Sequence, residues 1–222
     1  KLSETIPDFH DTRKRFENLW KEVDADPCGR VVEAHDELDW LRAAEDRACR
    51  LIDMHKSGQI PLRVTHNDTK INNVLFDTVT GEAKTVIDLD TVMPGLSLYD
   101  FGDSIRFSAN TATEDEKDVS KVSISLEYFK AYTLGYLSTA GESLTTEEIN
   151  QLAFSSKLMT LECGMRFLGD FINGDVYFKT EYPEHNLVRC HTQLALVADI
   201  EKKLPQMQEI VADCCRELGI EK

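Results

Sequence analysis

Side chains able to take part in phosphoryl transfer gather between residues 66 and 90. His66, Asp68 and Asn73 follow the spacing H-x-D-x-x-x-x-N, and Asp88 comes after a β-prone run further along the chain. In phosphoryl transfer a carboxylate meets the acceptor hydroxyl, while an amide oxygen and a second carboxylate hold Mg²⁺ against the nucleotide phosphates. The spacing is that of the kinase catalytic loop and predicts a phosphotransferase.

Each polar residue of this segment suits one role in such a reaction. We expect Asp68 to act as the catalytic base, and Asn73 and Asp88 to bind Mg²⁺. Asp90 is a further metal ligand or an orienting carboxylate, and the ammonium of Lys70 neutralises the transferred phosphoryl group. The alternative is that these residues only cap strand ends, which agrees less well with the strand, turn and strand that follow the loop.

Two further residues are expected to support the loop. His66 forms hydrogen bonds and does no chemistry itself. Asp100 begins Asp-Phe-Gly, the metal-binding triplet of protein kinases, but it lies well beyond the single hairpin that separates Asp68 from Asp88. We therefore expect Asp100 to cap a short helix or to brace the catalytic loop.

The elements that position these residues form a small β insert in a mostly helical α+β chain. β-prone runs occupy residues 62–65, 73–76 and 84–87, and a tight turn joins the last two into a hairpin. Helical spacing of apolar residues predicts helices over residues 1–25 and 38–55 before the insert.

The pattern after the insert is helical throughout. Capping boxes, Thr113 with Glu116 and Thr145 with Glu148, predict the starts of two helices. Residues 149–171 are apolar on two stripes, which predicts a helix buried on most sides. Two last helices are expected, separated at Pro205.

The composition excludes several classes of protein. The chain has 222 residues, 41% of them hydrophobic, enough for a full core. Its formal charge of -15 disfavours binding to nucleic acid or to an anionic membrane surface. No apolar run approaches the roughly 18 residues of a membrane helix, and the first residues do not form a signal peptide. We therefore expect a cytoplasmic protein; the sequence predicts no oligomeric state.

Two parts of a complete kinase have no counterpart in the sequence. There is no glycine-rich G-x-G-x-x-G loop, and no β-rich stretch with a phosphate-gripping lysine precedes the catalytic loop. We therefore expect residues 1–222 to be the C-terminal lobe of a protein-kinase-like phosphotransferase, inactive without a nucleotide-binding lobe. Residues 1–60 are the helical lead-in, 61–108 the catalytic and metal-binding insert, and 109–222 the helical acceptor-binding part.

The chain resembles the aminoglycoside phosphotransferase and choline kinase superfamily, whose C-terminal lobe has this helix-rich layout. The segment from His66 to Asn73 and the pair Ile87-Asp88 match its two signatures, and Asp100 falls where that superfamily has a later structural aspartate. The resemblance implies ATP as the phosphate donor and Mg²⁺ as the cofactor.

Within that superfamily the chain is most similar to the N-acetylhexosamine 1-kinases. Those enzymes transfer the ATP γ-phosphate to the anomeric hydroxyl of N-acetylglucosamine or N-acetylgalactosamine. The resemblance implies that Arg166 and Tyr177 hold the sugar. The segments that carry it are residues 65–70, 86–95, 99–103, 164–168 and 174–178.

The residues themselves leave alternatives open. Arg166 lies among apolar residues of the helix expected to be buried, where a guanidinium needs a partner, and that partner is either the sugar or a carboxylate in a salt bridge. Tyr177 stacks on a sugar or merely packs. The same lobe would also suit an aminoglycoside, choline, homoserine or another sugar. A non-catalytic relative is disfavoured, because Asp68, Asn73 and Asp88 are all present.

Overall fold

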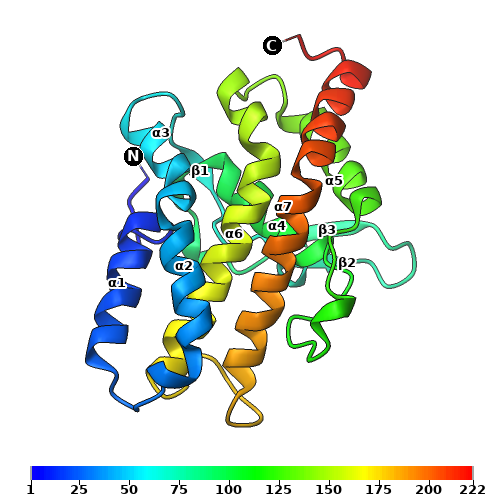
Figure 1. Ribbon diagram of the computed structural model, residues 1–222. Helices are drawn as coiled ribbons and strands as arrows, with labels where there is room; N and C mark the ends of the chain where they lie inside the picture. The colour runs from blue at the N-terminus through cyan, green and yellow to red at the C-terminus, as the bar shows by residue number, and fades with distance from the viewer. Residues whose placement is uncertain (1, 222) are drawn as a thin grey trace.

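Helices make up most of the computed structural model, which describes residues 2–221 (Figure 1). Two small antiparallel sheets of two strands each complete it, so the mostly helical α+β fold predicted from the sequence is confirmed. None of the helices in residues 2–221 combines the length and the apolar character that crossing a membrane requires. The α-helices are α1 (Thr12–Ala25), α2 (His35–Ala48), α3 (Arg50–Lys56), α4 (Ser97–Ser108), α5 (Leu126–Ala140), α6 (Thr146–Ile172) and α7 (His185–Leu218).

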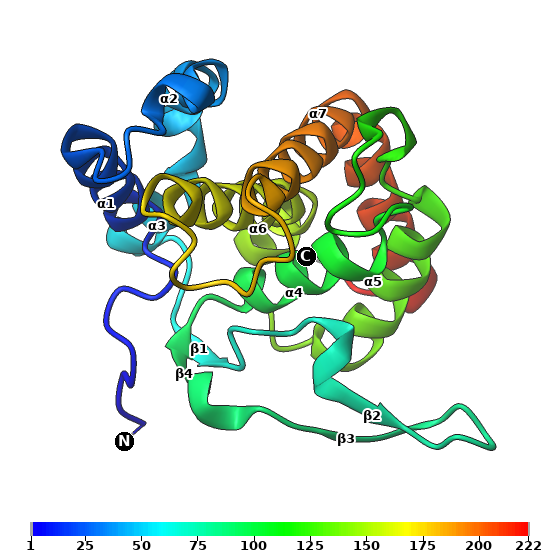
Figure 2. The ribbon, with the colours of Figure 1, turned by 90° about the horizontal axis from the view of Figure 1, so that it is seen from below.

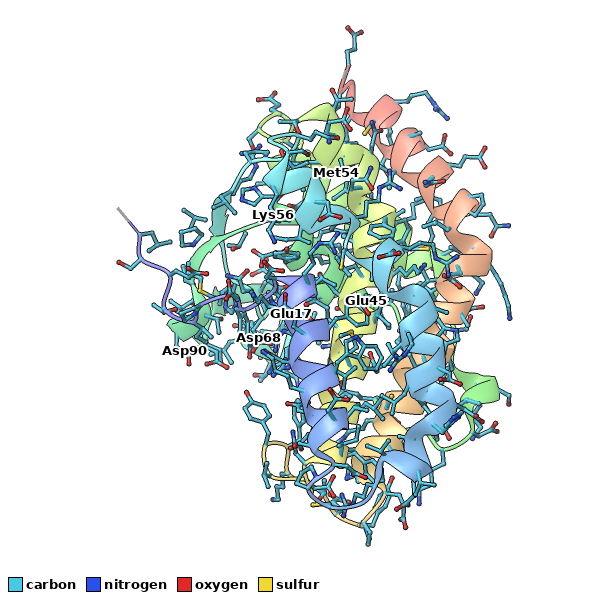
Figure 3. The ribbon with its side chains drawn as sticks, turned by 60° about the vertical axis from the view of Figure 1, so that its left-hand side comes forward. Glu17, Glu45, Met54, Lys56, Asp68 and Asp90 are labelled. Carbon is cyan, nitrogen blue, oxygen red and sulfur yellow. The ribbon has the colours of Figure 1, made fainter. Side chains whose placement is uncertain are left out.

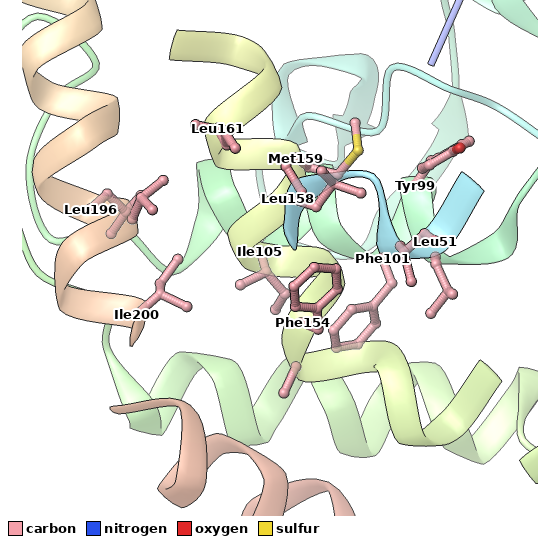
Figure 4. Close-up of a cluster of buried hydrophobic side chains, with 14 of the residues drawn as sticks. Leu51, Tyr99, Phe101, Ile105, Phe154, Leu158, Met159, Leu161, Leu196 and Ile200 are labelled. Atoms are coloured by element: carbon pink, nitrogen blue, oxygen red, sulfur yellow. The ribbon is translucent and has the colours of Figure 1, made fainter. Parts of the chain in front are cut away.

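Helix α6 lies at the centre of the helical part and packs against α1, α4 and α7. Its two apolar stripes explain this position, because a helix that is apolar on several sides must be covered on several sides. Figure 4 shows Phe154 and Leu158 of α6 among Phe101 of α4 and Leu196 of α7. All four side chains are at most 8% exposed. The predicted capping box of α6 is present, with Thr145 and Glu148 each accepting a backbone N–H of the other.

The strands lie on one side of the helices, as Figure 2 shows. β2 (Val74–Phe76) and β3 (Ala83–Val86) pair as the predicted hairpin. β1 (Arg63–Thr65) pairs with β4 (Met93–Gly95), a strand that the sequence analysis did not predict. Its residues Pro94 and Gly95 are typical of a turn, but a proline is tolerated in an edge strand of a two-stranded sheet.

Two predicted helix boundaries are wrong. Thr113 starts no helix: the N–H of Glu116 donates to the carbonyl of Thr113 in a turn, and the next helix, α5, is capped by Ser125. Residues 113–118 carry no apolar residue to bury, so tertiary packing does not stabilise a helix there. Pro205 does not separate two helices, because α7 continues through it. Packing of α7 against α5 and α6 outweighs the one hydrogen bond that proline removes.

The helices before the insert also differ from the prediction. α1 begins at Thr12, because Asp11 caps it by accepting the N–H groups of Arg13 and Lys14, and the residues before it are not helical. The predicted second helix is interrupted at Cys49 into α2 and α3.

Glu148 connects the β1 strand to the helices. Its carboxylate is 1% exposed and accepts hydrogen bonds from Arg63 (2.6 and 2.7 Å), the Ser97 hydroxyl (2.7 Å) and the Thr145 N–H (2.7 Å). Burial alone would raise the pKa of Glu148, but the hydrogen bonds from Arg63 and its other donors outweigh burial and hold the pKa below its ordinary value of 4.5. The strand that leads into the catalytic loop is therefore fixed by a buried charge.

We predict that Glu148→Gln lowers the free energy of unfolding at pH 7 by about 2–3 kcal/mol, because it leaves the Arg63 guanidinium with a neutral partner. A carboxyl group with a lowered pKa in the folded state stabilises the protein above its ordinary pKa and loses that contribution as the pH falls. The difference between variant and wild type should therefore shrink below about pH 4.5. Denaturant titrations at several pH values measure it, with the exposed neighbour Glu147→Gln as the control. Equal stability of Glu148→Gln and wild type at pH 7 would contradict this account.

Candidate active site

Asp68 lies in the loop between β1 and β2, with one carboxylate oxygen held and the other free. Its Oδ2 accepts a hydrogen bond from Asn73 Nδ2 (2.9 Å) and lies 3.0 Å from Lys70 Nζ. Asn73 Nδ2 also donates to the Asp68 carbonyl (2.7 Å). Within residues 2–221, Asp68 Oδ1 has no hydrogen-bond partner, so this oxygen is available to accept a hydroxyl proton.

Asp100, in the first turn of α4, braces this loop. Its Oδ2 accepts the His66 N–H (2.8 Å) and its Oδ1 accepts the Asn67 N–H (2.7 Å). Burial raises the pKa of Asp100, and the two amide donors offset only part of that rise. Of the two roles expected for Asp100, the observed contacts match bracing, because Leu96 is the N-cap residue of α4.

His66 connects the loop to the end of β3. Its Nε2 lies 3.0 Å from the Ile87 carbonyl and its Nδ1 3.3 Å from the Asp68 amide nitrogen. Because a carbonyl only accepts and an amide only donates, a neutral imidazole with its proton on Nε2 satisfies both contacts. The Ile87 N–H donates in turn to the Asn73 carbonyl (2.9 Å), so the two ends of the loop are tied to the residue before Asp88.

Asp88 and Asp90 follow β3 and are exposed. Asp88 adopts a left-handed backbone conformation (φ 63°), which aspartate tolerates better than most residues. Together with Asp68 and Lys70 they line a cavity of about 550 Å³. Figure 3 shows Asp68 and Asp90, two of its lining residues, on the same side of the molecule.

The exposed carboxylates of this cavity and the amide of Asn73, which donates to Asp68, fit a magnesium ion that is held mainly by a nucleotide. Asn73 is 5% exposed, and its Oδ1 has no hydrogen-bond partner within residues 2–221. No group of three His, Cys, Asp or Glu residues able to hold a metal ion occurs in that same stretch. Mg²⁺ bound to nucleotide phosphates needs only one or two protein carboxylates, and Asp88, Asp90 and the amide oxygen of Asn73 can supply these ligands.

Arg166 and Tyr177 line the same cavity. Arg166 Nη2 lies 3.4 Å from the Tyr177 hydroxyl, and its guanidinium lies 5.6 and 5.3 Å from the ring centres of Tyr177 and Phe178. Arg166 is only half-buried, which corrects the expectation of a buried guanidinium: α6 is covered on most sides, but this position borders the cavity. Within residues 2–221 no carboxylate oxygen lies within 4 Å of it, so the alternative of a salt bridge is not formed.

Sequence reasoning missed three residues beside the loop. His10, before α1, lies between Glu162 of α6 (Nδ1 to Oε2, 3.0 Å) and the carbonyl of Asn67 (Nε2 to O, 3.0 Å). These contacts join residues far apart in the chain, and no spacing indicates them. The one local signal was Asn67 itself, a residue type that tolerates the left-handed conformation it adopts (φ 65°).

The chain matches a known protein family. A model described as the phosphotransferase enzyme family matches residues 2–132, more than half of the chain. The match confirms the resemblance to the aminoglycoside phosphotransferase superfamily. It includes the catalytic loop, Asp88 and Asp100 but ends before Arg166 and Tyr177, so the finer resemblance to N-acetylhexosamine 1-kinases stays a prediction.

We predict that Asp100→Asn loosens the catalytic loop. An amide offers one acceptor oxygen, and its NH₂ group would face the second backbone N–H. Hydrogen exchange of the His66 and Asn67 amides should therefore become about 10- to 100-fold faster, as expected for losing a hydrogen bond to a charged group. The control is Asp118→Asn, because exposed Asp118 also accepts a backbone N–H, that of Ser120. Unchanged exchange at His66 and Asn67 would show that Asp100 does not hold the loop.

Proposed function

We propose that this chain, which belongs to the phosphotransferase enzyme family, is the acceptor-binding lobe of a small-molecule kinase that phosphorylates a sugar hydroxyl. The acceptor that we propose is an N-acetylhexosamine, phosphorylated on its anomeric hydroxyl. The observation that carries the proposal is the cavity in which Asp68, with one free carboxylate oxygen, meets both the exposed carboxylates of Asp88 and Asp90 and the Arg166–Tyr177 pair.

In the proposed reaction Asp68 aligns the acceptor. Its Oδ2 is held by Asn73 and Lys70, which leaves Oδ1 to accept the proton of the acceptor hydroxyl. As the hydroxyl oxygen bonds to the γ-phosphorus, the bond from that phosphorus to the bridging oxygen breaks, and ADP leaves. Transfer is direct, with no covalent intermediate on the protein. Lys70, whose Nζ lies 3.0 Å from Asp68 Oδ2, would neutralise negative charge on the transferred group.

The phosphate donor that we propose is ATP bound to Mg²⁺. ATP would supply the electrophilic γ-phosphorus, and Mg²⁺ would neutralise the negative charge of the phosphate oxygens. Asn73, Asp88 and Asp90 would hold the metal ion. Support comes from the chemistry of these groups. Asp88 and Asp90 are exposed carboxylates at one cavity, and Asn73, which donates to Asp68 of that cavity, has an amide oxygen without a hydrogen-bond partner in residues 2–221.

Exposed apolar side chains support the proposal that a nucleotide-binding lobe covers the β2–β3 hairpin. Leu75 and Phe76 of β2, Val86 of β3 and Leu89 after it are 45–59% exposed. The hairpin extends away from the helices in Figure 2. Exposed apolar residues that gather on one element commonly mark an interaction surface. We therefore propose that kinase activity requires a second lobe placed on this hairpin.

The Arg166–Tyr177 pair supports a sugar acceptor. A guanidinium without a carboxylate partner has donors free for hydroxyl oxygens, and Tyr177, 72% exposed, offers a ring on which a sugar face can stack. An acceptor carrying only positive charge, such as choline, would face the Arg166 charge.

Testing the function requires the protein with a nucleotide-binding lobe, ATP and Mg²⁺, and a panel of acceptors that includes N-acetylhexosamines, hexoses, choline, homoserine and an aminoglycoside. Phosphorus NMR identifies the phosphorylated position. Phosphate on C1 of an N-acetylhexosamine supports the proposal, whereas phosphate on another acceptor, or no transfer to any of them, contradicts it.

We predict that Asp68→Asn lowers kcat by roughly 10² or more with little change in nucleotide affinity, because an amide cannot accept the proton. Asp88→Asn should instead weaken binding of the metal–nucleotide complex. Steady-state kinetics and nucleotide titration of both variants separate these effects. Near-normal turnover of Asp68→Asn would refute its role as the base.

We predict that Arg166→Lys raises the KM of the sugar or lowers kcat/KM by about 1–3 kcal/mol, since an ammonium does not reproduce the fork of donors of a guanidinium. The KM of ATP and the melting temperature should change little, because Arg166 is half-buried and forms no salt bridge within residues 2–221. Kinetics and thermal unfolding of one purified variant test both statements. Lost stability with unchanged sugar kinetics would assign Arg166 a structural role instead.

A further inference from the structure

His10 is a buried histidine that the proposed reaction does not use. It is 8% exposed, lies just before α1, and packs its ring against Phe9 and against Tyr99 of α4, with ring centres 4.5 and 5.0 Å apart. From this position it reaches both α6 and the catalytic loop.

Both ring nitrogens of His10 face acceptors. Nδ1 lies 3.0 Å from Glu162 Oε2, and Nε2 lies 3.0 Å from the Asn67 carbonyl oxygen. A ring with a proton on each nitrogen donates to both, whereas a neutral ring would direct a lone pair at one of them. Glu162 is itself 2% exposed and is fixed by the Thr12 hydroxyl, which donates to Oε1 (2.6 Å). Acceptors on both sides therefore hold the His10 ring in one orientation.

The carbonyl that His10 binds belongs to the same peptide unit as the N–H of Asp68. That N–H donates to His66 Nδ1 (3.3 Å), so side chains hold this planar unit at both of its polar ends. Asn67, whose φ is 65°, turns the chain just before this unit. A fixed peptide plane and a fixed preceding residue leave Asp68 little freedom to rotate.

We propose that His10 is a positioning residue: anchored by Glu162, it fixes the peptide unit between Asn67 and Asp68 and thereby the carboxylate of Asp68. A buried ion pair commonly adds little net stability compared with apolar residues of similar size. The contribution of the His10–Glu162 pair is to orient the Asn67 carbonyl of the catalytic loop. The inference rests on the proposed role of Asp68 as the base.

The test compares His10→Phe, Glu162→Gln and the double variant in the protein that carries both lobes. Phenylalanine fits among the aromatic neighbours of His10 but donates no hydrogen bond. Glutamine at 162 can donate to Nδ1 of a neutral His10, which then keeps its Nε2–H on the Asn67 carbonyl. His10→Phe alone would leave the Glu162 carboxylate buried without its His10 partner, and the double variant replaces that carboxylate with a neutral amide.

We expect His10→Phe and the double variant to lose about 10- to 100-fold in kcat with an unchanged KM for the acceptor, the cost of a misplaced catalytic group. Glu162→Gln should stay within about threefold of wild type, as expected when the geometry of positioning is kept. The melting temperature should fall in His10→Phe and recover in the double variant. Recovery of kcat together with the melting temperature would overturn the proposal, because it would assign His10 a purely structural role.

Two additions keep this test independent of the proposed function. Hydrogen exchange at the Asp68 amide should become at least about tenfold faster in both variants that lack His10. The reason is that the Asn67 carbonyl, on the same peptide unit, loses its hydrogen bond, so the unit turns more readily and the N–H leaves His66 more often. The control is His185→Phe, because His185 is also buried and pairs with a carboxylate, that of Asp115 (3.3 Å), outside the loop contacts described above. If the wild type phosphorylates no acceptor, the proposed function is wrong. If hydrogen exchange at the Asp68 amide is unchanged in the variants that lack His10, the role of His10 is wrong, whatever the outcome for the function.

Discussion

The orientation of Asp68 depends on the side chains that bind the backbone of residues 66–68. Every N–H and carbonyl of these three residues has a side-chain partner, and the six partners come from five different residues. Because each backbone group is bonded, the loop is held without belonging to a helix or a strand. The partners are Asp100 for the N–H groups of 66 and 67, Thr91 for the carbonyl of 66, His10 for the carbonyl of 67, His66 for the N–H of 68, and Asn73 for the carbonyl of 68.

The helical core holds these partners in place. Asp100 lies in the first turn of α4 and Glu162 belongs to α6, and these two helices pack against each other. Figure 4 shows Phe101 of α4 and Leu158 of α6 in the same buried cluster. Glu148, also in α6, binds Arg63 of β1 just ahead of the loop. Helix α6 thus supports the loop at two points, through Glu162 and His10 and through Glu148 and Arg63. The packed helices therefore hold the catalytic loop in one position.

The sequence predicts those parts of the molecule whose signals are local. The H-x-D-x-x-x-x-N spacing, the hairpin and the capping box of α6 each lie within a few residues. The fold class follows from the helical spacing of apolar residues around one short run of β-prone segments. The failures depend on tertiary packing: α7 passes through Pro205 because neighbouring helices support it, and Arg166 is half-buried because α6 borders a cavity there. The His10–Glu162 contact joins two segments that only the fold brings together, so no sequence pattern indicates it.

In the proposed reaction a fixed Asp68 carboxylate directs a single, direct transfer of the phosphoryl group. The most direct measurement is the stereochemical course at phosphorus, followed with ATP whose γ-phosphorus is made chiral with oxygen isotopes. A single in-line transfer to the acceptor inverts the configuration, and this is the result that we predict. Retention would mean two successive transfers through a phosphorylated side chain, and it would contradict the role of Asp68 as a base that only aligns and deprotonates the acceptor.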